Sequence, residues 1–174
     1  MENKNFTNRI ALCGIFTALA LIFSYVEAIV PLPLGVPGIK MGFANIIIVV
    51  ALYTMDAKTA FAINILRIII AGLLFTGVFG MLYSLAGGIL SFLSMLIIKK
   101  IKYFSILGVS ISGGVAHNLG QILTAALIIS NIKMFVYFPV LVLSGVVTGT
   151  IIGFISLNII NILPASIKVR LHRF

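Results

Sequence analysis

The chain has 174 residues, of which 61% are hydrophobic and only 9% are charged, and its formal net charge is +9. So few charged side chains cannot cover the surface of a soluble globular protein, and we expect lipid to be its solvent. We interpret the basic excess as a sign of membrane topology rather than of nucleic-acid binding. The three acidic residues, Glu2, Glu27 and Asp56, are too few for carboxylate catalysis.

Long apolar runs predict an all-α fold, a polytopic bundle of six transmembrane helices that forms a single integral membrane domain over residues 1–174. A hydrocarbon core of about 30 Å requires about 20 helical residues. We expect helices at about 9–30, 42–55, 59–79, 81–98, 105–130 and 134–162. The second segment is short for a span, so we expect it to be tilted or to pair closely with the third.

The distribution of basic residues predicts the orientation. One set of loops and chain ends holds nine Lys and Arg residues and the other set holds two. The richer side of a membrane protein is the cytoplasmic one. We therefore expect a multi-pass protein of the cell membrane with both termini in the cytoplasm and the loop 31–41 outside. The nine are Lys4, Arg9, Lys58, Lys99, Lys100, Lys102, Lys168, Arg170 and Arg173; the two are Lys40 and Lys133.

Polar side chains interrupt two of the apolar runs near their middle. A polar group at bilayer depth is costly unless it is paired or faces a cavity, so such residues mark candidate sites. Asn64 and Arg67 stand three residues apart, and His117 and Gln121 stand four apart, so each pair shares one helix face. With the polar residues of the flanking segments, the predicted substrate-binding set is Glu27, Lys40, Asn45, Asn64, Arg67, His117, Asn118 and Gln121.

The predicted set carries more positive charge than Glu27 can neutralise. One interpretation is a pocket, open outward, for a small molecule with an anionic or hydrogen-bond-accepting head, because a guanidinium offers a planar fork to such groups. The alternative is a structural ion pair between Arg67 and Glu27. No second His, Cys or carboxylate stands at metal-ligand spacing from His117, so we expect neither a metal nor another cofactor.

Several catalytic motifs are absent from the sequence. It contains no GxxxxGK[ST] phosphate loop, no aspartate-rich pair of motifs for magnesium diphosphate, and no Ser-His-Asp arrangement. We therefore do not expect an enzyme, although His117 as an acid or base in a membrane enzyme stays open. If the chain is a transporter, we expect its energy to come from another subunit.

Small residues follow one face of the first predicted helix, at Ala11, Gly14 and Ala18. Such spacing lets another helix approach closely. The sequence does not distinguish packing within this chain from docking of a second membrane subunit.

Three segments carry a family resemblance: PGIKMGFAN (37–45), GMLYSLAGGILS (80–91) and GVSISGGVAHNLGQILTAALI (108–128). Over about residues 30–160 the chain resembles the heptaprenyl diphosphate synthase component I family, also called the Gx transporter family. Members of this family are similar to the S components of energy-coupling factor (ECF) transporters. Those proteins have six helices and capture a nutrient from outside.

The resemblance implies two functions. As an S component, the chain would bind a small anionic or quinone- or isoprenoid-related molecule. It would pair with a membrane coupling subunit and two cytoplasmic ATPase subunits, with Ala11, Gly14 and Ala18 as the coupling face. The synthase name implies instead a membrane accessory subunit of a polyprenyl diphosphate synthase in isoprenoid quinone biosynthesis, whose basic cytoplasmic surface would bind a soluble prenyltransferase. Neither function involves nucleic acid.

Overall fold

The described part of the chain is helical throughout and contains no β-strand. The computed structural model describes residues 2–30, 40, 42–101 and 103–163, and for residues 2–9 it describes the backbone only. The all-α prediction is confirmed. The elements are α1 (Glu2–Ile29), α2 (Asn45–Thr54), α3 (Ala57–Ala71), η1 (Gly72–Thr76), α4 (Gly77–Lys100), α5 (Ile106–Ile129), η2 (Ile132–Tyr137) and α6 (Phe138–Ile162).

Each predicted helical segment is present, with two changes in the middle and late parts of the chain. The segment predicted at 59–79 ends in a π-helical turn, η1, and the chain then reverses direction at Gly77, whose φ of 68° suits a residue without a Cβ. The segment predicted at 134–162 begins as the 3₁₀ helix η2 before α6 starts. Most of the predicted outer loop, residues 31–39 and 41, lies outside the described residues.

The turn between α2 and α3 is fixed by a side-chain cap. The Asp56 carboxylate accepts hydrogen bonds from Thr59 N at 2.9 Å and from Thr59 Oγ1 at 2.8 Å. A carboxylate at this position satisfies otherwise unpaired N–H groups of the first helical turn. The sequence therefore ends α2 and starts α3 within two residues, and these two helices become neighbours.

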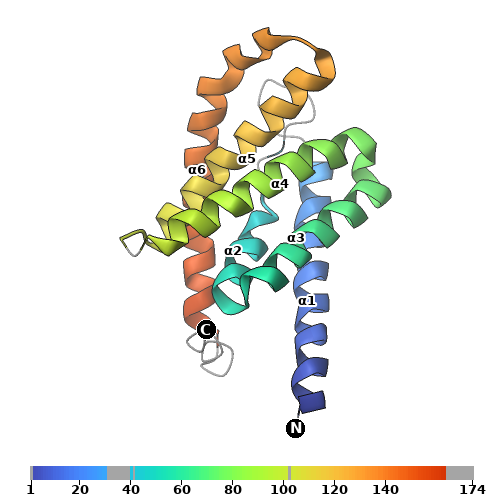
Figure 1. The fold of residues 1–174 in the computed structure, drawn as a ribbon, viewed down its shortest axis with the longest axis vertical. Coiled ribbons are helices and arrows are strands. Elements are labelled where there is room, and N and C mark those ends of the chain that lie inside the picture. The colour runs from blue at the N-terminus through green and yellow to red at the C-terminus, as the bar shows by residue number, and fades with distance from the viewer. Residues whose placement is uncertain (1, 31–39, 41, 102, 164–174) are drawn as a thin grey trace.

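The helices α4, α5 and α6 run antiparallel as consecutive neighbours, whereas α3 and α4 form a hairpin bent at η1 (Figure 1). The short helix α2 lies inside the bundle against α1, α3 and α6. All of its residues except Tyr53 are buried. Its side chains Ile48, Val49 and Leu52 form the centre of the hydrophobic core.

Four apolar segments in the described residues are long enough to cross a membrane: Ile10–Ile29, Ala57–Lys100, Ile106–Ile129 and Ile132–Ile162. The second comprises the α3–α4 hairpin. With 10 residues, α2 is about 15 Å long, roughly half of a hydrocarbon core. The helix lengths therefore establish four membrane-length segments, and the predicted count of six spans does not follow from them.

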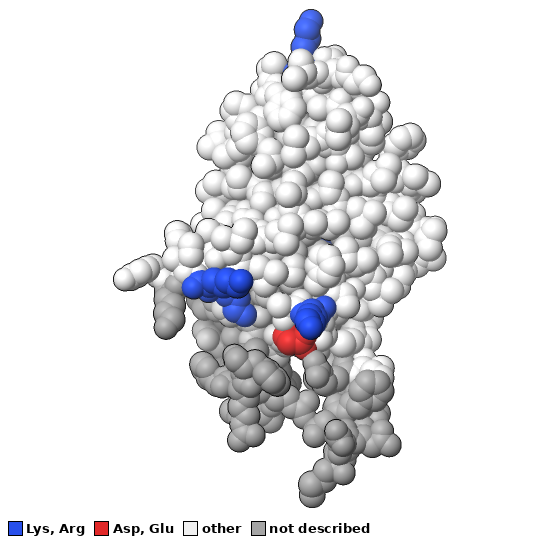
Figure 2. Space-filling model, viewed as in Figure 1, with Lys and Arg blue, Asp and Glu red and all other residues white. Residues whose placement is uncertain are grey.

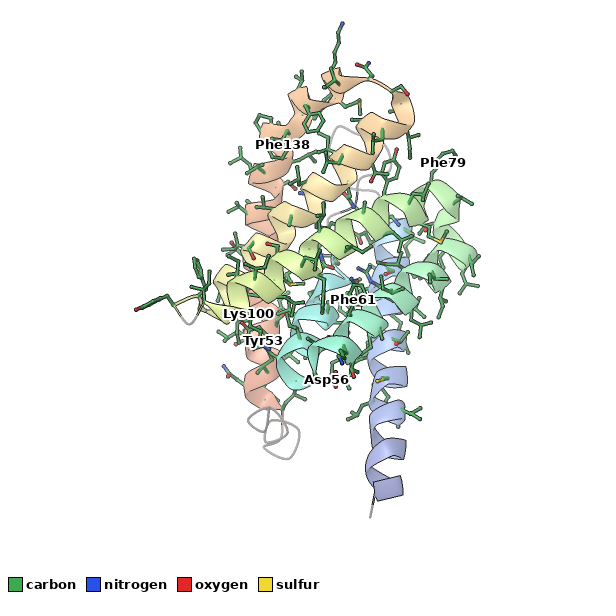
Figure 3. All side chains as sticks on the ribbon, viewed as in Figure 1. Tyr53, Asp56, Phe61, Phe79, Lys100 and Phe138 are labelled. Atoms are coloured by element: carbon green, nitrogen blue, oxygen red, sulfur yellow. The ribbon has the colours of Figure 1, made fainter. Side chains whose placement is uncertain are left out.

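The outer surface is that of a membrane protein. Large apolar side chains are exposed along every long helix, among them Ile22, Leu73, Leu127 and Leu143. A broad surface without charge separates the lysine at one end from the lysines and the acid at the other (Figure 2). Asp56 and Lys100 lie toward the end where α1 begins, and Phe79 and Phe138 lie toward the opposite end (Figure 3). Of the basic residues counted for orientation, Lys102, Lys168, Arg170 and Arg173 lie outside the described residues, as do the side chains of Lys4 and Arg9.

Glycines allow α5 and α6 to touch backbone to backbone, which generates the first prediction. A Cβ on Gly149 would stand 2.7 Å from Ile111 Cα, whereas a Cβ on Gly14 of α1 meets nothing within 4 Å. We expect Gly149→Ala to lower the free energy of unfolding by about 1–3 kcal/mol, the usual effect of overpacking. Gly14→Ala is the matched control and should not be destabilising. Thermal melts of both purified variants in detergent check this, and equal melting temperatures would contradict the close α5–α6 contact.

Candidate functional site

Polar side chains from four helices and one loop surround a hollow inside the bundle. The hollow has an empty volume of about 290 Å³, open space at its mouth included. Its enclosed part holds on the order of one water molecule. It is lined by Ser24 and Glu27 of α1, Lys40 and Gly42 of the loop before α2, Arg67, Ile68 and Ala71 of α3, Ser84 of α4, and His117 of α5.

Arg67 is the central side chain of the site and is 4% exposed. Its Nη2 donates to Asn64 Oδ1 at 2.9 Å and its Nε donates to the same oxygen at 3.2 Å. The bonds on the far side of the guanidinium are longer: 3.4 Å from Nη1 to Ser24 Oγ and 3.3 Å from Nη2 to Asn45 Oδ1. Each of these acceptors is a neutral oxygen, so these bonds of the buried guanidinium go to dipoles, and the Glu27 carboxylate acts on it only through space.

Asn64 fixes the orientation of this guanidinium. Its Oδ1 accepts twice from Arg67, and its Nδ2 donates to the backbone oxygen of Gly88 on α4 at 3.1 Å. The approach of α3 to α4 requires a glycine there, because a Cβ on Gly88 would stand 2.7 Å from Ile68 Cδ1 and 3.2 Å from Asn64 Nδ2. Asn64 is therefore held at both ends of its amide, and it positions Arg67 toward the hollow.

Two backbone bonds attach the loop before α2 to the site. The Gly42 N–H donates to Glu27 Oε1 on α1 at 2.5 Å, and the Lys40 N–H donates to Gln121 Oε1 on α5 at 3.2 Å. Gly42 has φ +81°, and a Cβ on it would stand 3.3 Å from the His117 ring. This loop thus joins α1 to α5 and brings the Lys40 side chain to the edge of the hollow.

The hydrogen bonds of Gln121 determine the protonation of His117. Because Gln121 Oε1 accepts from Lys40, the amide nitrogen Nε2 faces His117 Nε2, 2.9 Å away. An amide nitrogen is only a donor, so His117 Nε2 must accept. The ring is then neutral, with its proton on Nδ1, which lies beside Gly87 of α4. His117 adds no positive charge to the site.

The charged groups around the hollow are Glu27, Lys40 and Arg67. The structure gives no ion pair between Glu27 and Arg67 within the part that it describes, so the alternative of a direct structural pair is not the arrangement found. Burial lowers the pKa of the Lys40 ammonium, and the Glu27 carboxylate opposes that shift. With both basic groups protonated and Glu27 ionised, the site keeps a net positive charge.

Four of the eight predicted binding residues line the hollow: Glu27, Lys40, Arg67 and His117. Three more, Asn45, Asn64 and Gln121, hydrogen-bond to these residues, and the eighth does neither. Asn118 is buried against α6, where its Nδ2 donates to Leu141 O at 2.7 Å. Its neighbour His117 faces the hollow instead, because successive residues of a helix point about 100° apart. Sequence reasoning missed Ser24 and Ser84. Ser24 stands three residues before Glu27 on the same helix face, which is the signal that would have found it.

The predicted docking residues of the first helix take no part in packing within the chain. Ala11, Gly14 and Ala18 are all exposed, and no described atom lies near the position of a Cβ on Gly14. The bundle therefore leaves this small-residue face of α1 open. No group of three His, Cys, Asp or Glu residues that could hold a metal ion occurs in the described residues.

Comparison with known protein families identifies the chain. The family model of heptaprenyl diphosphate synthase component I matches residues 16–159, which include every helix that contributes to the site. The chain belongs to this family. No curated protein and no solved structure matches it.

The tautomer of His117 gives the second prediction. In a His172→Gln background, which leaves one histidine, ¹⁵N NMR at neutral pH should report a neutral ring protonated on Nδ1. Gln121→Leu removes the amide donor and should change the nitrogen shifts of that ring. An Nε2-protonated ring in the chain with Gln121 present would contradict the hydrogen-bond arrangement.

Proposed function

We propose that this member of the heptaprenyl diphosphate synthase component I family is a non-catalytic membrane subunit that binds a small amphiphile with an anionic head. The observation that carries the proposal is the buried guanidinium of Arg67, which has neutral partners and faces a hollow. A buried cation without a carboxylate partner is costly, and a function in binding explains why it is there.

The family name supports one possible complex for such a subunit, a heptaprenyl diphosphate synthase. A component of a heptaprenyl diphosphate synthase handles isoprenoid chains, so the ligand belongs to isoprenoid or isoprenoid-quinone chemistry. In this assembly the chain is the membrane accessory subunit, and a soluble prenyltransferase carries out the chemistry on the cytoplasmic side. Of the two lysines in the last turn of α4, Lys100 is exposed and is available to such a partner, whereas Lys99 donates to Leu52 O at 2.6 Å.

The exposed small-residue face of α1 supports a second assembly. Ala11, Gly14 and Ala18 are open to a neighbouring helix, as docking on a membrane coupling subunit requires. In this assembly the chain is the S-component-like subunit of an ECF-type transporter and works with two cytoplasmic ATPases. It captures its ligand from outside.

Both assemblies use the same orientation in the cell membrane. In this orientation both termini are in the cytoplasm and the chain crosses six times, with the short α2 counted as a crossing that covers only part of the hydrocarbon core. Because Ser24 and Glu27 lie near the C-terminal end of α1, the hollow is then nearer the outer surface. The excess of basic residues near the termini supports this orientation.

A pull-down of the tagged full-length chain from native membranes in mild detergent tests the assembly. Mass spectrometry then identifies the protein partners and the retained small molecules. Recovery of a soluble prenyltransferase supports the accessory subunit, and recovery of a coupling protein with two ATPases supports the transporter. If the chain purifies with neither a protein partner nor an anionic ligand, the proposal is wrong.

The same preparation gives the third prediction. Arg67→Gln should reduce the retained anionic ligand by about tenfold or more, because a charge-assisted bond to a buried guanidinium is lost. Lys133→Gln removes the same charge at an exposed position far along the chain and should retain the ligand. Equal retention by the two variants would show that the head group is bound elsewhere.

A fourth prediction separates the two assemblies through α1. Gly14 is exposed, and a Cβ on it meets no atom within 4 Å apart from its own stretch of helix, so Gly14→Leu should not change thermal stability or ligand retention. If α1 docks on a coupling subunit, recovery of that subunit should fall severalfold, because close helix approach needs small residues. Undiminished recovery would exclude this face as the interface.

A further inference from the structure

The charges around the hollow restrict the kind of anion that the site takes. Its lining contains two basic groups, Lys40 and Arg67, and one acid, Glu27. The fourth titratable group, His117, is neutral because its Nε2 accepts from Gln121. Counted in their ordinary ionised forms, Lys40, Arg67 and Glu27 leave the site with an excess of one positive charge.

We infer that the site takes a head with a single negative charge, a carboxylate, and not the diphosphate of a prenyl diphosphate. This inference rests on the proposed function. Each phosphoryl group carries about one to two negative charges near neutral pH, so a diphosphate exceeds the positive charge of the site. The buried excess of negative charge would then be uncompensated, which is strongly unfavourable.

A divalent metal does not remove this mismatch. Proteins that bind phosphates commonly hold Mg²⁺ through carboxylates together with the phosphate oxygens. Among the described residues that line the hollow, Glu27 is the one carboxylate, and it already accepts from the Gly42 N–H. Moreover, in the described part of the chain no three His, Cys, Asp or Glu residues lie close enough together to hold a metal ion.

The geometry of Arg67 suits a planar head. Asn64 holds the guanidinium through Nε and Nη2 at 3.2 and 2.9 Å. The long bonds from Nη1 to Ser24 and from Nη2 to Asn45 are the ones that a ligand can replace at least cost. These two nitrogens form a fork that matches the two oxygens of a carboxylate. The enclosed space holds on the order of one water molecule, so it must enlarge less for a carboxylate than for a double tetrahedral diphosphate.

In this arrangement each polar residue has a separate role in binding the ligand. Arg67 contacts the head and supplies the fork, and Asn64 is a positioning residue that acts through Arg67. Lys40 adds a second charge from the loop before α2. Glu27 holds that loop through Gly42 and sets the net charge, so it discriminates against heads that carry more than one negative charge.

Three probes with one tail and different heads test the inference: farnesoic acid, farnesyl diphosphate and farnesol. Their dissociation constants are measured by calorimetry on the purified full-length chain in lipid nanodiscs, with and without Mg²⁺. We expect farnesoic acid to bind about tenfold or more tightly than either of the other two, with no effect of Mg²⁺. Arg67→Lys keeps the charge but loses the planar fork, so it should reduce that preference.

The outcomes separate the inference from the proposed function. If farnesyl diphosphate binds as tightly as farnesoic acid and Arg67→Gln abolishes both, the site is an anion site and the inference about its head is wrong. If no probe binds, or Arg67→Gln changes nothing, both fail. Glu27→Gln keeps an oxygen acceptor for Gly42 and removes the negative charge. Glu27→Gln should therefore reduce the difference between the dissociation constants of farnesoic acid and farnesyl diphosphate. An unchanged difference would contradict the charge argument.

Discussion

One buried guanidinium links three helices of the bundle, and the candidate site is built around it. Arg67 lies deep in an apolar chain, and burying its charge is costly unless polar groups surround it. The structure provides them from α1, α2 and α3 together, through Ser24, Asn45 and Asn64. The packing of these three helices therefore also supplies the polar groups that solvate the charge of Arg67.

A second layer of contacts keeps this polar centre in place. The loop before α2 is bonded to α1 through Glu27 and to α5 through Gln121. On the other side, the glycines of α4, α5 and α6 let those helices approach backbone to backbone. One half of the bundle is thus held by polar contacts and the other by close packing, and the hollow lies where the two halves meet.

The sequence predicts the helices well because in lipid the apolar runs must be helical. It also predicts Arg67 beside Asn64 and His117 beside Gln121, because helical spacing fixes such pairs. It fails for Asn118, since α5 packs against both α4 and α6, and periodicity does not tell which neighbour a polar residue will face. The π turn at Gly72–Thr76 is missed because an apolar run looks the same whether its bonds span four or five residues. Arg67 bonds to neutral oxygens and not to Glu27. Residue spacing does not predict this, because the choice of partner depends on how the helices pack in three dimensions.

The most direct measurement of the central claim is a crystal structure of the full-length chain with a carboxylate amphiphile bound. We expect the carboxylate oxygens to lie within hydrogen-bond distance of Arg67 Nη1 and Nη2, where they replace Ser24 and Asn45. The bonds from Arg67 to Asn64 should be kept. A head group bound elsewhere, with the four present contacts of Arg67 intact, would contradict the account and leave Arg67 a structural residue.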